Sequence, residues 1–136
     1  MKTTADTSVI VASFASWHEN HAVAVAAIAR IDVVIAHCLL ETYSVLTRFP
    51  APHRMAADVV AKYLHSAFGH HPIVALPAND HRKLVAACAA QGLSGGTIYD
   101  AAIAATTIHA GAKLLTLDGR ARPTYVALGA DHELLS

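Results

Sequence analysis

Short β-branched segments alternate with longer alanine-rich segments along this chain. Ile31–Ala36 (IDVVIA) and Pro72–Leu76 (PIVAL) have the length and composition of strands that are buried on both faces. Helical patterns lie between them, and the prolines at positions 50 and 52 end the first of those helices. Strands that alternate with helices over short connections form a mostly parallel sheet covered by helices. The sequence therefore predicts an α/β fold.

The other expected elements continue this alternation. We expect strands over Lys2–Ala5 and Lys113–Leu117, and a short final strand near Val126–Leu128. The expected helices are, in chain order, Ser8–Phe14, His18–Arg30, His37–Phe49, Arg54–Phe68, His81–Gln91 and Thr97–Ala110. Asn79 can cap the fifth of these helices. No repeat or linker interrupts the pattern, so we expect a single domain over residues 1–136.

Composition excludes several classes of protein. With 54% hydrophobic and 15% charged residues, the chain is too apolar to be disordered. A long uncharged run, Leu84–Tyr99, contains glutamine and glycines, so we expect no membrane span. Asp6 interrupts the apolar start, which argues against a secretory signal. Cys38 and Cys88 are far apart and unpaired in the sequence, as buried thiols are in a reducing compartment. We expect a soluble cytoplasmic protein.

The overall charge gives little support to nucleic-acid binding. Ten basic and ten acidic residues cancel, whereas a nucleic-acid-binding protein usually has a basic balance. The ten histidines add positive charge only below their usual pKa of about 6.5. Any RNA-binding patch must therefore be local.

Four acidic residues are expected at the same end of the sheet. Asp6 follows the first strand, and Asp118 follows the strand over 113–117. Glu41 lies in the first turns of the helix after the second strand, and Asp100 lies in the first turn of the helix that Thr97 opens. Open parallel sheets bind ligands beyond the carboxyl ends of their strands, where the strand order reverses. This placement makes the four carboxylates candidates for one site.

Each carboxylate also has an ordinary structural explanation. Asp6 can cap the helix that follows it, and Asp100 has a capping-box spacing from Thr97. Asp118 precedes a glycine, as in many turns, and Glu41 can lie on a solvated helix face. Together, however, four neighbouring carboxylates repel one another unless a cation lies among them. Mg²⁺ prefers oxygen ligands, and a bound cation can activate water for phosphodiester hydrolysis.

Four short segments, in this order, carry a family resemblance. They are Asp6–Ile10 (DTSVI), Glu41–Arg48 (ETYSVLTR), Ile98–Thr106 (IYDAAIAAT) and Leu115–Asp118 (LTLD). Their order and spacing resemble those of the PIN-domain ribonucleases, specifically the toxin members of bacterial VapBC toxin–antitoxin pairs. The resemblance spans nearly the whole chain.

The resemblance implies a three-layer α/β/α fold and a nuclease that cuts RNA with water activated by Mg²⁺ or Mn²⁺. The residues that match the family's acidic, metal-holding positions are Asp6, Glu41, Asp100 and Asp118. The RNA can be a tRNA, an rRNA or an mRNA. The resemblance also implies a homodimer and a cognate VapB-type antitoxin whose tail fills the acidic groove.

Five further residues are candidates for supporting roles. Thr7 and Thr116 match the family's small hydroxyl residues and would orient carboxylates or water. Many relatives carry Asp or Asn two residues past the last acidic position, where this chain has Arg120, so we expect one metal ion. Arg48, Arg120 and Arg122 are candidates for contacts with the RNA backbone. The alternative is that they are ordinary solvated arginines on the surface with no part in RNA binding.

Other functions remain open at this point. A catalytically inactive domain of the same fold can bind RNA or an antitoxin. A phosphatase of the haloacid-dehalogenase type also begins with an Asp after its first strand, but it needs a second Asp where this chain has Ser8. His18 and His21 are three residues apart, and the zinc-protease motif needs four. Trp17 can stack on an RNA base, or it can lie in a partly buried core or a dimer interface.

Overall fold

The computed structural model describes residues 1–136 and contains five strands. They are β1 (Lys2–Ala5), β2 (Val34–Ile35), β3 (Ile73–Val74), β4 (Ala112–Thr116) and β5 (His132–Leu134). β4 pairs with β1 and with β5, β2 pairs with β3, and all three pairings are parallel. The Thr3 carbonyl of β1 accepts a hydrogen bond of 2.8 Å from the backbone NH of Asp32, just before β2. The strands thus form two ladders, β1-β4-β5 and β2-β3, and β2 lies beside β1, which arranges the strands in the order β3-β2-β1-β4-β5.

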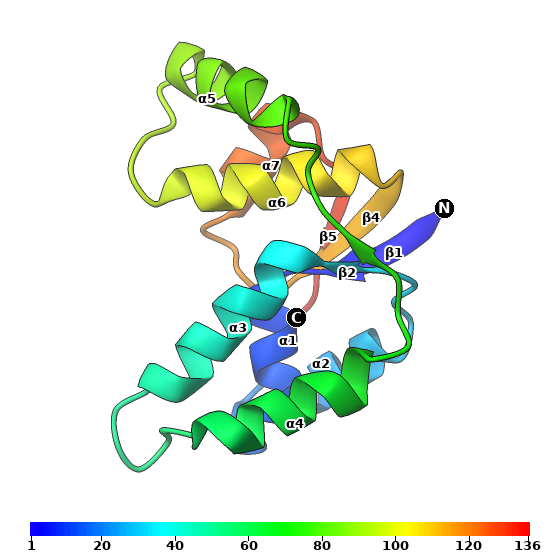
Figure 1. The fold of residues 1–136 in the computed structure, drawn as a ribbon, viewed down its shortest axis with the longest axis vertical. Helices are drawn as coiled ribbons and strands as arrows, with labels where there is room; N and C mark the ends of the chain where they lie inside the picture. The colour runs from blue at the N-terminus through cyan, green and yellow to red at the C-terminus, as the bar shows by residue number, and fades with distance from the viewer.

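Seven helices connect the strands and cover the sheet. They are α1 (Thr7–Phe14), α2 (His21–Ile28), α3 (Ala36–Arg48), α4 (Ala57–Phe68), α5 (Asp80–Ala90), α6 (Thr97–His109) and α7 (Arg122–Leu128). Figure 1 shows α5, α6 and α7 on one side of the strands, and α1, α2 and α4 on the other. The predicted three-layer α/β/α fold is confirmed. None of the helices is both long and apolar enough to cross a membrane.

Burial along the strands explains why two helical layers are needed. Successive side chains of a strand point to opposite faces of the sheet. Leu114 and Leu115 of β4 are nevertheless only 0% and 1% exposed, and Val34 and Ile35 of β2 are equally buried. Full burial of such a side chain stabilises a fold by about 2 kcal/mol relative to exposure. Strands with two apolar faces are therefore stable only between two layers of helices.

The strand order reverses between β1 and β4. From β1 the chain continues to β2 and β3 on one side, and from β4 it continues to β5 on the other. The two connections leave in opposite directions and open a crevice, which is where α/β proteins bind ligands. Asp6 directly follows β1, and Asp118 lies two residues beyond β4. The topology therefore brings these two acidic residues to one crevice.

The predicted strand near Val126–Leu128 is wrong. These residues end helix α7, and the last strand begins only at His132. Tyr125 is 1% exposed whereas Val126 is 65% exposed, which is the one-sided burial of a surface helix. Gly129, with φ of 79°, ends α7 in the left-handed conformation. An apolar run this short does not distinguish a strand from a helix.

Two other predicted elements are longer than those observed. α2 begins at His21 rather than at His18, because the His18 Nδ1 accepts a hydrogen bond of 3.0 Å from the Asn20 NH and holds these residues in a loop. The second strand is reduced to Val34–Ile35, with α3 starting at the next residue. Asn79 is the N-cap residue of α5, as predicted, but its side chain makes no capping hydrogen bond. Because α2 begins only at His21, the loop over residues 15–20 forms a wall of the crevice.

Candidate active site

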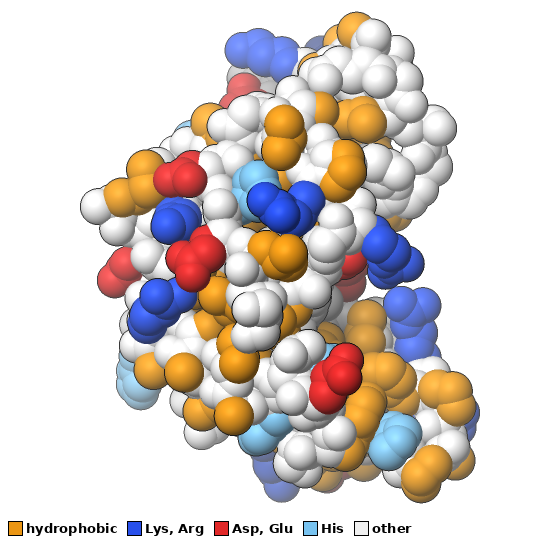
Figure 2. All heavy atoms as spheres, turned by 180° about the vertical axis from the view of Figure 1, so that it is seen from behind, with side chains coloured by type: hydrophobic (Ala, Val, Ile, Leu, Met, Phe, Trp, Pro, Cys, Tyr) orange, Lys and Arg blue, Asp and Glu red, His pale blue; other side chains and the backbone are white.

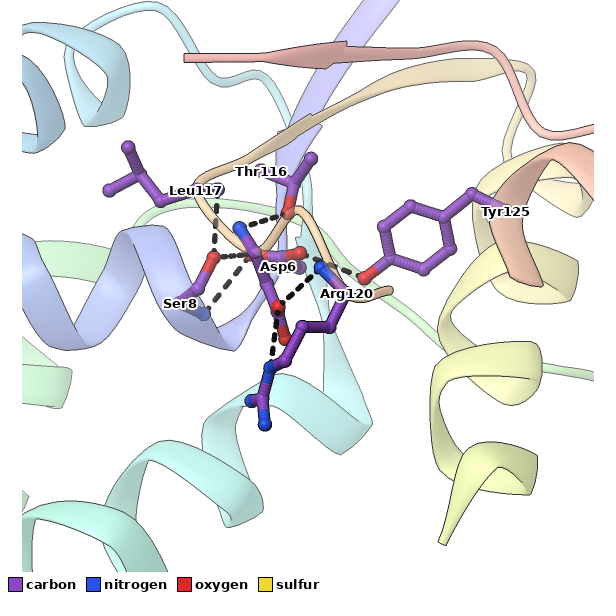
Figure 3. Close-up of polar contacts among 7 residues, drawn as sticks. Asp6, Ser8, Thr116, Leu117, Arg120 and Tyr125 are labelled. Carbon is purple, nitrogen blue, oxygen red and sulfur yellow. Dashed lines mark hydrogen bonds and ion pairs between the residues drawn. The ribbon is translucent and has the colours of Figure 1, made fainter. Parts of the chain in front are cut away.

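Asp6 is the most buried of the four acidic residues, with 2% of its surface exposed. It caps α1, and its Oδ1 accepts hydrogen bonds from the backbone NH groups of Ser8 (3.0 Å) and Val9 (3.4 Å). The Tyr125 hydroxyl donates to Oδ2 at 2.8 Å (Figure 3). Burial raises the pKa of Asp6, although hydroxyl groups of Ser8, Thr116 and Tyr125 act in the opposite direction. Asp6 is therefore a helix cap, and it is also a fixed wall of the crevice.

Ser8 ties the two loops of the crevice together. Its hydroxyl donates to Asp6 Oδ1 at 2.5 Å and accepts a hydrogen bond of 2.9 Å from the backbone NH of Leu117 (Figure 3). Leu117 directly follows β4. The hydroxyl thus connects the start of α1 to the segment that carries Asp118.

Glu41 reaches the crevice from α3 and does not lie on a solvated helix face. The Thr7 hydroxyl donates to Glu41 Oε1 at 2.5 Å, and His37 Nε2 lies 3.8 Å from Oε2. His37, and then the Thr7 hydroxyl, lower the pKa of Glu41 against the opposing effect of burial. Glu41 in turn raises the pKa of His37. The Glu41 carboxylate is therefore held ionised and oriented by two neighbours.

Asp100 enters from the opposite layer, in the first turn of α6. The N-cap of that helix is Gly96 and no side chain caps it, so the capping-box interpretation is wrong. Burial and three neighbouring carboxylates raise the pKa of Asp100 to about 6. These neighbours are Asp118, Glu41 and Asp6, in decreasing order of effect. The repulsion that like charges produce at a shared site is therefore present among the four residues.

Asp118 is held by the turn after β4. Its backbone NH donates to the Thr116 hydroxyl at 3.0 Å, and its Oδ1 accepts hydrogen bonds from Arg120 N (3.0 Å) and Nε (3.4 Å). Thr116 is fully buried, whereas the Arg120 side chain is almost fully exposed. Asp118 therefore lies in a turn, as its position before a glycine predicted. Its carboxylate also contributes to the negative charge around Asp100.

The four carboxylates line one cleft of about 550 Å³. Its walls come from α1, the α1–α2 loop, α3, α6 and the segment from β4 to α7. The predicted site residues on these walls are Asp6, Thr7, Glu41, Asp100, Asp118 and Arg120. Figure 2, seen from behind, shows a recess in one edge of the molecule, with acidic side chains inside it and basic side chains beside it.

Three predicted site residues do not line the cleft. Thr116 lies beneath it, fully buried. Arg122 is at the start of α7, where its Nε lies 3.3 Å from the Nε2 atom of a histidine in β5. Arg48 is exposed at the end of α3. Because it stands seven residues after Glu41, it is on the same face of the helix and lies towards the margin of the cleft.

The structure adds three residues that the sequence interpretation missed, namely Ser8, His37 and Tyr125. Ser8 stands two residues after the capping aspartate, and His37 stands one helical turn before Glu41, so both spacings contained a readable signal. Nothing marks Tyr125, which is 119 residues away from Asp6 in the sequence.

The cleft offers the donor atoms that a hard divalent cation prefers. Carboxylate oxygens with hydroxyl neighbours suit Mg²⁺ and Mn²⁺. No group of three histidine, cysteine or acidic side chains is close enough to hold an ion. Mg²⁺ is typically held by only one or two carboxylates and several waters, and a cation here would relieve the repulsion around Asp100. The residues present therefore fit Mg²⁺ or Mn²⁺.

Comparisons with known proteins cover nearly the whole chain. A family model described as PIN domain matches residues 4–126. Ribonuclease VapC40, from two strains of Mycobacterium tuberculosis, is 47% identical over 131 residues, which make up 96% of this chain and 97% of the relative. Ribonuclease VapC27 of the same species is 35% identical over 125 residues, or 91% of this chain and 90% of the relative.

Proposed function

Since the chain belongs to the PIN-domain family, we propose that it is an endoribonuclease that hydrolyses RNA phosphodiester bonds with the help of Mg²⁺ or Mn²⁺. The observation that carries the proposal is the convergence of four carboxylates, from four separate segments, on one cleft where the strand order reverses. The raised pKa of Asp100 supports it, because such crowding destabilises the protein unless a cation binds. Two relatives named as ribonucleases supply the substrate class.

The proposed roles follow from how each side chain is held. A bound Mg²⁺ or Mn²⁺ supplies charge that stabilises the phosphate in the transition state and lowers the pKa of a bound water. Asp6 and Glu41 are fixed by hydrogen-bond donors, so they need not rearrange when RNA enters. Asp100 and Asp118 complete the proposed metal site, in which one or two of the four carboxylates bind the cation directly and the others bind it through water. Arg120 is exposed beside Asp118 and is positioned to contact a phosphate oxygen.

Thr7 and Thr116 are the proposed orienting hydroxyls, one for Glu41 and one for the turn that carries Asp118. Of the three predicted RNA-binding arginines, Arg120 and Arg48 retain this proposed role. Arg122 is directed towards β5 and has weaker support.

We further propose that the chain is the toxin of a type II pair, inhibited by a VapB-type antitoxin, and that it forms a homodimer. Support comes from the family and from the VapC relatives. Sedimentation of the isolated chain tests the dimer, since a monomer has a mass of 14.3 kDa. A catalytically inactive RNA- or antitoxin-binding domain is the alternative, and the cleavage assay below distinguishes the two. The phosphatase alternative lacks support, because Ser8 donates to Asp6 where that class needs an acid.

An RNA-cleavage assay tests the nuclease proposal. The wild-type chain is incubated with tRNA, rRNA and mRNA in Mg²⁺ or Mn²⁺, with and without EDTA. The variants are Asp6→Ala and Asp100→Asn, with Asp131→Asn as the control because it removes an exposed carboxylate outside the cleft. We expect metal-dependent cleavage by the wild type and the control, and a loss of roughly 100-fold or more in the other two.

Equal cleavage by all variants, or cleavage that EDTA leaves unchanged, would contradict this mechanism. Binding of RNA without cleavage by the wild type would favour the inactive domain. Circular dichroism of each variant verifies that the loss of activity does not reflect unfolding.

A further inference from the structure

A stack of exposed aromatic rings borders the acidic cleft. Trp17, in the α1–α2 loop, is 45% exposed. Its ring stacks on His53, with the centroids 4.0 Å apart and an interplanar angle of 27°. Phe49 meets the indole edge-on, with a centroid distance of 5.4 Å. Because His53 is also exposed, these two rings, here called the Trp17–His53 stack, present an aromatic surface to solvent.

The indole ring lies outside the hydrophobic core. Trp17 belongs to none of the three hydrophobic clusters. Its neighbours Phe14 and Phe49, in contrast, pack against the cluster that contains Val11 and Leu46. A tryptophan that serves only the fold normally buries its large ring. Packing in the core therefore does not explain the exposure of Trp17.

Two elements lead from the carboxylates to the stack. His18 and Asn20, in the same loop as Trp17, line the cleft, and the His18 ring is 5.9 Å from the indole ring. On α3, Val45 lines the cleft and Phe49 follows four residues later. Four residues of helix span about 6 Å. Phe49 consequently lies about one helical turn beyond the margin of the cleft, and the stack lies next to Phe49.

Positive charge lies along the same path. Arg48 is exposed between Val45 and Phe49, and Arg54 is exposed next to His53, with its Nε donating to the Phe49 carbonyl at 3.0 Å. The acidic cleft itself repels phosphates that are not paired with a cation. Two arginines beyond the cleft therefore stand where the RNA backbone on one side of the cleaved bond can be attracted.

We propose that an unpaired base of the RNA packs on the Trp17–His53 stack while the cleaved phosphate lies in the acidic cleft. This inference rests on the proposed nuclease function. Phe49 stands eight residues, about 12 Å of helix, from Glu41. A stacked strand advances about 3.4 Å per nucleotide, so the base lies roughly four nucleotides from the cleaved bond. Every base has a face that can stack on an aromatic ring, while a base inside a duplex is not accessible. The contact thus selects unpaired over paired RNA and reads no particular base.

Intrinsic fluorescence reports on this contact directly, because Trp17 is the only tryptophan of the chain. A fluorescein-labelled, single-stranded RNA of eight nucleotides is titrated into Asp100→Asn protein in Mg²⁺. Anisotropy of the label measures binding, and Trp17 emission measures stacking. We expect quenching that follows the binding curve, and weaker quenching when the strand is annealed to its complement. Binding without any quenching overturns the inference.

Kinetics on the otherwise wild-type chain give a second, independent readout. Trp17→Ala should raise KM for an unpaired oligonucleotide by roughly 10-fold, the loss of one base stack, and leave kcat nearly unchanged. Trp17→Phe should restore most of the loss. The matched control is Tyr43→Ala, which removes a similarly exposed ring (42%) from the face of α3 that lines the groove with α4. A dinucleotide, too short to reach the stack, should be cleaved equally by all.

The outcomes separate the inference from the proposed function. If the wild type cleaves RNA and Trp17→Ala has an unchanged KM, the stacking inference is wrong and the nuclease proposal stands. If no variant cleaves RNA, the nuclease proposal fails, and quenching by RNA still decides whether a base stacks on Trp17. Emission that changes with protein concentration in the absence of RNA would instead assign the ring to contact between copies of the chain.

Discussion

At the scale of single residues, the four carboxylates differ in how firmly they are held. Both oxygens of Asp6 accept hydrogen bonds, and Glu41 has a hydroxyl and a histidine beside it. Asp100, in contrast, is raised to a pKa of about 6 by burial and by like charges. Repulsion between like charges therefore acts on Asp100, whereas burial raises the pKa of Asp6.

Replacing Asp100 with Asn should stabilise the metal-free protein at neutral pH. The folded state retains the Asp100 proton up to about pH 6, whereas the unfolded chain loses it near the usual aspartate pKa of 3.8. The free energy of unfolding of the wild type thus falls as the pH rises through this window. Because Asp100 is half-exposed, we discount the effect to about 1 kcal/mol, or roughly 3 °C in Tm.

The measurement is thermal unfolding in EDTA at pH 7.5 and pH 4.5. Asp100→Asn should unfold at a higher temperature than the wild type at pH 7.5, with a smaller difference at pH 4.5. Identical melting temperatures of the two proteins at pH 7.5 and at pH 4.5 would show that ionisation of Asp100 does not destabilise the fold.

Tyr125→Phe should destabilise the fold by about 1–2 kcal/mol, because it leaves the buried Asp6 carboxylate without a donor to Oδ2. Urea unfolding at pH 7.5 measures the difference. Tyr99→Phe is the control, since Tyr99 is 56% exposed and its hydroxyl can bond to water. Equal midpoints for the two variants would mean that the Tyr125 hydroxyl contributes nothing to stability.

The residue scale also shows what the sequence could and could not predict. The positions of Asp6 and Asp118 followed from their places after two strands, and the structure does bring both to one cleft. The contact of Tyr125 with Asp6 is not predictable in this way, because the sequence predicts no helix over the segment that carries Tyr125 and predicts a strand over the next residues. Long-range contacts of this kind depend on topology that local patterns do not contain.

At the scale of elements, the parallel neighbours β1 and β4 create the cleft. The alternation of apolar segments in the sequence predicted most of the strands and helices. Errors fell where elements are short. Two-residue strands such as β2 carry almost no periodic signal, and α7 is only seven residues long. Hydrogen bonds outside regular ladders, such as that from Asp32 to the Thr3 carbonyl, hold these short pieces in place.

Helix α7 should depend on the glycine that ends it. Gly129 has φ of 79°, and an added Cβ would meet no atom within 4 Å, so Gly129→Ala should cost about 1 kcal/mol through conformation alone. Gly129→Asn should cost less, since Asn tolerates this conformation better. Gly119→Ala is the control, because its backbone is not left-handed and its surroundings are equally open. Equal free energies of unfolding in urea for Gly129→Ala and Gly119→Ala would contradict this explanation.

At the scale of the whole molecule, the cleft is where the two helical layers meet. Glu41 comes from α3 and Asp100 from α6, which lie on either side of the sheet ends in Figure 1. A cation bound between them would be held from both sides and would join the two halves. The central claim is therefore that the four carboxylates form one site for a divalent cation.

Binding of Mn²⁺ at pH 7.5, measured by calorimetric titration of the wild type and of Asp100→Asn, tests this claim most directly. We expect one Mn²⁺ per wild-type chain and binding at least roughly 10-fold weaker in the variant, because the variant removes one charge of the cluster. No detectable binding by the wild type, or equal affinity in the two proteins, would contradict it.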